Sequence, residues 1–396
     1  MRIAARLSVW LLLLIVVTLC GSDAVRAAEE QDKASSYLVY VGTYTQGRSK
    51  GKGIYRFRLD MASGALKSVG APTEAINPSF LALHPGGKFL YAVNETGAWE
   101  GRMNSGAVSA YAIDARTGDL TFLNRQLSRG GAPCHLSVDA TGRSVHVANY
   151  SGGSVISFPI GSDGRLGSEV SFFQHEGSSV TPRQKGPHAH CINLDAGNKF
   201  AFVADLGLDK VLIYRLDAKS GKLTVNSPAF AKLAPGSGPR HFAIHPDQKH
   251  AYVINEMAST VTVFNYDAAR GSLEATQTIT TLPEGFEGRT STAEVFVHPS
   301  GKFLYGSNRG HNSIVAYRID PRTGKLTYVD HQGEGVDVPR NFAIDPTGTY
   351  LLVESQGADT MLTFRIDQES GRLEPTGHVV KVPAAVSAVM LPWDGE

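Results

Sequence analysis

A short turn phrase recurs along the whole chain at intervals of about fifty residues. It opens with an Asp in most copies and closes on Gly-x-Leu, as in "IDARTGDL" and "IDPRTGKL". Asp and Gly suit a tight hairpin turn, because Asp caps backbone amides and Gly adopts a positive φ. The copies end at Leu66, Leu120, Leu166, Leu223, Leu273, Leu326 and Leu373, in steps of 54, 46, 57, 50, 53 and 47 residues. Seven units at this spacing predict the blades of a β-propeller.

A second phrase lies between these turns and predicts hairpins. "HFAIHPDQKHAYVINE", for example, shows two alternating apolar runs around a Pro/Asp turn, and five other segments share this form. A seventh hairpin can be assembled from "SYLVYVGTYT" near the start of the chain and "AVSAVMLP" at its end. We therefore expect an all-β fold: a seven-bladed β-propeller of four-stranded antiparallel blades, whose last blade is closed by strands from both termini.

The first residues have the build of a secretory signal peptide. Two arginines precede an apolar run from Leu7 to Cys20, and a Val-Arg-Ala tripeptide ends at Ala27. We expect a signal peptide over 1–27, a flexible mature N-terminus over 28–36 and a single propeller domain over 37–392. The mature protein would then be exported to the periplasm or outside the cell. Lipid attachment at Cys20 is an alternative, although Leu19 is bulky where such sites usually need a small residue.

Charge and cysteine content narrow the possible partners. Removal of residues 1–27 leaves 35 basic and 36 acidic residues, so no basic stripe points to nucleic acid. No second hydrophobic run predicts a membrane span. Only Cys134 and Cys191 remain, too few for a disulfide framework, and whether they pair stays open. We expect a monomer with no cofactor. We also expect no metal site, because the His188-x-His190 pair lacks recognisable acidic partners.

Comparison of the repeats separates scaffold positions from candidate site positions. The hairpin turn carries either His or Asp in every copy, as a turn-capping role allows. Two other positions vary and are mostly polar. The first strand begins with Ser79, Cys134, His190, Arg240, Ala293 and Arg340. The second strand is followed by Tyr44, Glu95, Tyr150, Leu206, Glu256, Arg309 and Gln356. Both positions lie at one end of an antiparallel hairpin, so we expect them to converge around the mouth of the central channel.

Several longer phrases carry a family resemblance. "GAPCHLSVDATGRSVHVANYSGGSV", "KGPHAHCINLDAGNKFAFVADLGLDKV" and "GSGPRHFAIHPDQKHAYVINEMASTV" closely resemble the lactonase family of seven-bladed propellers, over essentially the whole mature chain. That family includes propeller-type 6-phosphogluconolactonase and 3-carboxy-cis,cis-muconate lactonizing enzyme. The resemblance implies a lactone hydrolase of the 6-phosphogluconolactonase type, which opens a small anionic or sugar (phospho)lactone by attack of water at the channel mouth.

The resemblance also implies a catalytic set. A histidine, two arginines and a glutamate of the family match His190 or its neighbour His188, Arg240, Arg309 and Glu256. The same two positions supply Glu95, Arg340 and Cys134 as further candidates for substrate binding. The residue after the strand start, which also varies between copies, adds His135, His241 and Glu294, and His188 is the neighbour of His190.

Lactone hydrolysis needs a base for the attacking water and positive charge where the oxyanion develops. Glu256 or His190 would be the base, while Arg240 and Arg309 would hold the substrate anion and stabilise the oxyanion. Three alternatives remain open: a purely structural Arg240–Glu256 salt bridge, a muconate-type lactonizing cycloisomerase, and a non-catalytic exported propeller that binds a partner.

Overall fold

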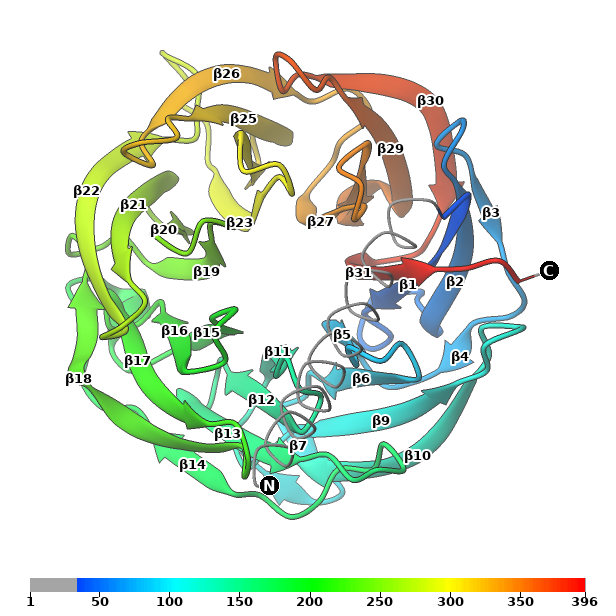
Figure 1. Cartoon of the computed structure of the whole chain (residues 1–396), viewed down its shortest axis with the longest axis horizontal. Coiled ribbons are helices and arrows are strands. Elements are labelled where there is room, and N and C mark those ends of the chain that lie inside the picture. The colour runs from blue at the N-terminus through cyan, green and yellow to red at the C-terminus, as the bar shows by residue number, and fades with distance from the viewer. Residues whose placement is uncertain (1–33, 396) are drawn as a thin grey trace, which may run out of the picture.

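The predicted seven-bladed propeller is confirmed in the computed structural model, which describes residues 34–395. The blades form a ring around a central channel, and each blade is built on four antiparallel strands (Figure 1). The only helical segments among the described residues are two short 3₁₀ turns, Pro182–Gln184 and Gln356–Ala358. None of the described residues forms a helix with the length and apolarity that crossing a membrane requires. The predicted signal peptide lies outside the described residues.

Within each blade, the four strands follow one another in order from the channel to the outer rim. Blade 1 contains β31 (Ala385–Pro392), β1 (Ser36–Thr43), β2 (Gly53–Asp60) and β3 (Leu66–Ser68), with β4 (Thr73–Glu74) beside β2. Blade 2 contains β5 (Leu81–Leu83), β6 (Phe89–Asn94), β9 (Ala107–Ile113) and β10 (Leu120–Leu127). Blade 3 contains β11 (Pro133–Val138), β12 (Ser144–Asn149), β13 (Ser154–Pro159) and β14 (Ser171–Gln174). Blade 4 contains β15 (Ala189–Leu194), β16 (Phe200–Asp205), β17 (Lys210–Asp217) and β18 (Lys222–Lys232).

The remaining blades follow the same order. Blade 5 contains β19 (Pro239–Ile244), β20 (His250–Asn255), β21 (Thr260–Asp267) and β22 (Ser272–Thr280). Blade 6 contains β23 (Ser291–Val297), β24 (Phe303–Arg309), β25 (Ser313–Ile319) and β26 (Leu326–Gln332). Blade 7 contains β27 (Pro339–Ile344), β28 (Tyr350–Ser355), β29 (Thr360–Ile366) and β30 (Leu373–Lys381). A small hairpin, β7 (Ala98–Trp99) and β8 (Arg102–Met103), lies in the insertion after β6.

The ring closes as the sequence predicts, by pairing the two ends of the chain. β31 runs antiparallel to β1, with Tyr37 opposite Pro392 and Val41 opposite Ala388. β1 begins at Ser36, one residue before the predicted start of the domain. The Ser36 hydroxyl also donates a hydrogen bond to the carbonyl oxygen of Trp393 at 2.6 Å. Because β1 is paired with β31, the N-terminal strand of the propeller leaves no unpaired edge at the point where the ring closes.

The histidines of the hairpin turns link neighbouring blades. His298 shows the arrangement: its Nδ1 accepts from the Ser300 amide at 3.1 Å, and its Nε2 lies 2.8 Å from the Gly348 carbonyl of the next blade. The turn position thus serves the scaffold. The apolar faces of neighbouring blades pack directly on one another, as where the Phe202 and Phe242 rings stack at 4.9 Å.

Glu354 departs from this repeated scaffold. It lies on β28 at a position that other blades fill with Val93, Ala148 or Ile254. Its side chain is fully buried, and neither carboxyl oxygen has a hydrogen-bond partner. Burial raises the pKa of Glu354 well above its usual range, so the group stays protonated over a wide pH range in the folded state.

We expect Glu354→Met to stabilise the protein. The substitution removes a buried polar group without a partner and keeps the volume similar, so the free energy of unfolding at pH 7 should rise by about 1–3 kcal/mol. Because the folded-state pKa is raised, wild-type stability falls as pH rises above about 4.5 towards that pKa, and the advantage of the variant should grow over the same range. Urea unfolding at several pH values measures this. Glu374→Met, on the exposed outer strand of the same blade, is the control, and a variant less stable than wild type at pH 7 would contradict the assignment.

Candidate active site

A β-bulge at the same place in several blades points one side chain into the channel mouth. The register of the first hairpin shifts between Pro239 and His241, which leaves Arg240 without a strand partner. The same shift occurs at Cys134, His190 and Arg340. A bulge re-aims a side chain and breaks the strict alternation of the strand. These positions therefore face the mouth. The residues after three of them, His135, His241 and Asn341, line the channel below it. The innermost strands of the blades surround this channel (Figure 1).

The carboxylate of Glu256 is the centre of the mouth. Its Oε1 lies 2.7 Å from Nη1 of Arg183, and its Oε2 lies 3.0 Å from both Nε of Arg240 and Nη2 of Arg309. Burial alone would raise the pKa of Glu256, but the three arginines outweigh that effect and lower it to about 2. Glu256 is therefore ionised at every physiological pH.

Two of these arginines are also anchored to the backbone of blade 6. Nη1 of Arg240 donates to the Ala293 carbonyl at 2.7 Å, and Nη2 of Arg309 donates to the Thr292 carbonyl at 2.7 Å. Burial and the charge of Arg340 lower the pKa of Arg240. Burial and Arg240 lower the pKa of Arg309 to about 9, which still leaves it protonated at neutral pH. Each guanidinium is thus held by one backbone hydrogen bond and one ion pair with Glu256.

His190 lies beside the Glu256 carboxylate. Its Nε2 lies 3.9 Å from Oε2 of Glu256, too far for a direct hydrogen bond. Its Nδ1 lies 3.7 Å from Sγ of Cys134, and its ring meets the Tyr150 ring edge-on at 5.3 Å. Burial and the neighbouring Arg240 hold the pKa of His190 well below its usual range, so the imidazole is neutral.

His188 has a different position from His190. Its ring stacks on Tyr150 with the centroids 4.6 Å apart. Its two ring nitrogens each lie 3.1 Å from a backbone carbonyl, that of Tyr150 and that of Arg183. His188 thus supports the loop that carries Arg183, and His190 is the histidine that approaches Glu256.

The opposite side of the mouth carries Glu95 and Arg340. Oε2 of Glu95 accepts hydrogen bonds from the Tyr44 hydroxyl at 2.9 Å and from the Ser79 hydroxyl. The guanidinium of Arg340 lies over the Tyr44 ring, 5.6 Å from its centroid. Both charged side chains are half-buried and face the same opening as Glu256.

His135, His241 and Glu294 form a layer below the mouth. Nδ1 of His241 lies 2.7 Å from Oε1 of Glu294, and the other Glu294 oxygen accepts from the Asn341 amide. Burial raises the pKa of Glu294 to about 7, although Arg240 opposes this. The same side chains line a cavity of about 480 Å³ that continues along the channel towards the hairpin turns and includes Pro246 but neither Arg240 nor Glu256. These three candidates for substrate binding are therefore placed behind the mouth.

Arg183 is a member of the cluster that the repeats could not predict. It lies in the insertion between β14 and β15, outside any repeated position. Its Nη2 contacts the Tyr150 hydroxyl at 2.8 Å, and its side chain is 46% exposed. Nothing in the sequence marked this arginine among the other charges of the loop.

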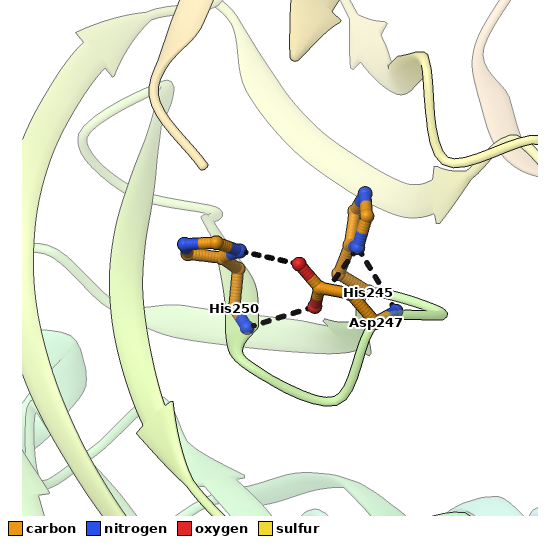
Figure 2. Close-up of side chains that lie close together, drawn as sticks. All are labelled: His245, Asp247 and His250. Atoms are coloured by element: carbon orange, nitrogen blue, oxygen red, sulfur yellow. Dashed lines mark hydrogen bonds and ion pairs between the residues drawn. The ribbon is translucent and has the colours of Figure 1, made fainter. Parts of the chain in front are cut away.

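Among the described residues, one set of three potential metal-ligating side chains lies close together, at a hairpin turn of blade 5. The ligand atoms of His245, Asp247 and His250 lie within 4.8 Å of one another, as Figure 2 shows. However, Nδ1 of His245 accepts from the Asp247 amide at 3.1 Å, and its Nε2 lies 2.8 Å from the Gly301 carbonyl. This repeats the scaffold arrangement of His298, so the cluster is explained as a turn. Cys134 and Cys191 are both free and buried.

The fold and the mouth define a propeller whose channel opening holds a glutamate, a neutral histidine and several arginines. The family model described as "Lactonase, 7-bladed beta-propeller" matches residues 38–390, and the chain belongs to this family.

Individual relatives agree with this assignment. A 6-phosphogluconolactonase of Bacillus subtilis is 36% identical over 308 residues, covering 78% of this chain and 85% of the relative. A solved periplasmic gluconolactonase of Pseudomonas aeruginosa is 33% identical with a TM-score of 0.84, covering 90% of this chain and 99% of that one. A putative 6-phosphogluconolactonase of Bacteroides fragilis is 36% identical with a TM-score of 0.83, covering 90% and 98%.

We expect Glu256→Gln to destabilise the folded protein. Without its charge, the buried guanidinium of Arg240 loses its closest compensating carboxylate, and the free energy of unfolding at pH 7 should fall by about 3 kcal/mol. Because the folded-state pKa of Glu256 is lowered, its contribution is present above about 4.5 and lost as pH falls towards 2, so the difference should shrink over that range. Urea unfolding measures both effects. Adding Arg309→Met to the variant should recover part of the loss, and a Glu256→Gln protein as stable as wild type would show that the ion pairs contribute nothing.

Proposed function

We propose that the protein hydrolyses a lactone at the mouth of its channel. The observation that carries this proposal is the 3.9 Å gap between Nε2 of His190 and Oε2 of Glu256. The gap is too long for a direct hydrogen bond, and a water molecule can bridge it while contacting both atoms. A neutral imidazole and an ionised carboxylate at such a position can orient the water and accept its proton.

His190 and Glu256 have different roles, because their charge states differ. Glu256 neutralises three arginines and is a poor proton acceptor, because its pKa is lowered to about 2. His190 is therefore the base, and Glu256 holds the water and stabilises the imidazolium that forms. This is the logic of a histidine oriented beside a carboxylate.

The reaction balances without any further reactant. The water oxygen attacks the lactone carbonyl carbon while His190 takes the water proton on Nε2. Arg183 and Arg309, which keep part of their surface open to the mouth, stabilise the negative charge on the carbonyl oxygen. The ring carbon–oxygen bond then breaks, and the imidazolium returns the proton to the leaving oxygen, giving a hydroxy acid.

We expect His190→Asn to abolish most of the activity while the fold persists. Loss of the base should lower kcat by about 10²–10⁴-fold at neutral pH. Initial rates on a panel of phosphorylated and unphosphorylated sugar lactones measure this, and His378→Asn on the outer strand β30 is the matched control. A wild-type protein that opens none of these lactones, or a His190→Asn variant as active as wild type, would overturn the proposal. A protein that instead cyclises muconate-type substrates would be a cycloisomerase.

We further propose that the protein is exported. The support is the charged, apolar and small-residue order of residues 1–27, together with a similar solved structure named as a periplasmic enzyme. Fractionation of cells that express the full chain should recover activity outside the cytoplasm, with an N-terminus at residue 28. Deletion of residues 2–27 should retain the protein in the cytoplasm, and an unchanged distribution would contradict export by this segment.

A further inference from the structure

Arg340 is the arginine of the mouth that has no anionic partner. Arg183, Arg240 and Arg309 all pair with Glu256. Within residues 34–395, Arg340 makes neither a hydrogen bond nor an ion pair. Its guanidinium instead makes a cation–π contact with the Tyr44 ring. A half-buried guanidinium with free donors at the opening of a site is available to a ligand.

The surroundings of Arg340 keep it charged and in place. Burial works against its charge, but Tyr44, Glu95 and Glu256 outweigh that effect, and the pKa of Arg340 is raised. Tyr44, on which the guanidinium rests, is itself fixed by its hydrogen bond to Glu95. The aromatic face positions the planar group without using any of its five donors.

The mouth as a whole carries an excess of positive charge. Four guanidinium groups face the two carboxylates of Glu95 and Glu256, and the adjacent His190 is neutral. Such a surplus in a partly buried site is unfavourable until an anion enters. The other three guanidinium groups already pair with Glu256, so Arg340 is the group best placed to bind such an anion.

We propose that Arg340, supported by Tyr44, binds an anionic substituent of the lactone and makes the site selective for phosphorylated or carboxylated lactones over uncharged ones. This inference rests on the proposed function, because it concerns the end of the lactone that lies away from His190 and Glu256. Bidentate contact between a guanidinium and a phosphate or carboxylate is the interaction that supplies the selectivity.

The test compares three lactones with the full-length protein and its variants. Glucono-δ-lactone is the uncharged probe, its 6-phosphate is the phosphorylated probe, and a glucaric acid lactone is the carboxylated probe. Arg340→Met should raise KM for the charged lactones by about 30-fold more than KM for glucono-δ-lactone, and should leave kcat for the charged lactones within about threefold. Arg340→Lys should lose less, because it keeps the charge but not the fork.

The outcomes separate this inference from the proposed function. Arg322→Met, at an exposed turn between β25 and β26, is the control for loss of an arginine. The larger of the two KM effects identifies phosphate or carboxylate as the preferred anion. If wild type opens lactones but Arg340→Met and Arg340→Lys change KM equally for all three probes or for none, the selectivity of Arg340 is disproved and lactone hydrolysis stands. If wild type opens no lactone, the proposed function fails and this inference fails with it.

Discussion

Closure of the ring by β31 and β1 is the constraint on which the site depends. Each blade delivers only one or two side chains to the channel mouth, so no single blade contains a site. The pairing of the chain ends completes blade 1, whose strand β31 contacts β5 of blade 2 and β27 of blade 7. Residues as distant in sequence as Tyr44 and Arg340 can therefore meet in one mouth. The scaffold histidines of the turns reinforce the ring from the opposite end of the hairpins.

The bulge at the start of the first strand in blades 3, 4, 5 and 7 is what turns a repeated scaffold into a site. In a regular strand, neighbouring residues point to opposite faces. The bulge instead sends Arg240 to the mouth and leaves His241 in the layer below, against Glu294. Arg240 consequently lies between the charge of Glu256 above and the carboxyl of Glu294 below, and both favour its protonated form. The local distortion thus stacks two polar layers within one channel.

The fold was predictable from the sequence because its repeat is explicit, and the site was predictable only in part. Alignment of the repeats placed Arg240, Glu256, Arg309 and His190 at one mouth, since hairpin length fixes which positions share an end. It could not separate His188 from His190, because that choice depends on where the bulge falls. Arg183 was not identifiable, because loop residues have no repeated position to compare. Nor could the repeats show that His135, His241 and Glu294 lie one layer deeper, because adjacent positions in a strand look equivalent in sequence.

The two halves of the mouth carry different charged side chains. Blades 4, 5 and 6 supply His190, Glu256 and the two anchored arginines, which are joined by ion pairs with Glu256 and by hydrogen bonds to the backbone of blade 6. Blades 7, 1 and 2 supply Arg340, Tyr44 and Glu95, where the guanidinium keeps its donors free. The half that contains Glu256 has its arginines held by ion pairs, whereas Arg340 in the other half has no anionic partner among the described residues. A propeller with near-sevenfold symmetry of its backbone thereby orients an asymmetric ligand, solely through which side chain each blade places at two equivalent positions.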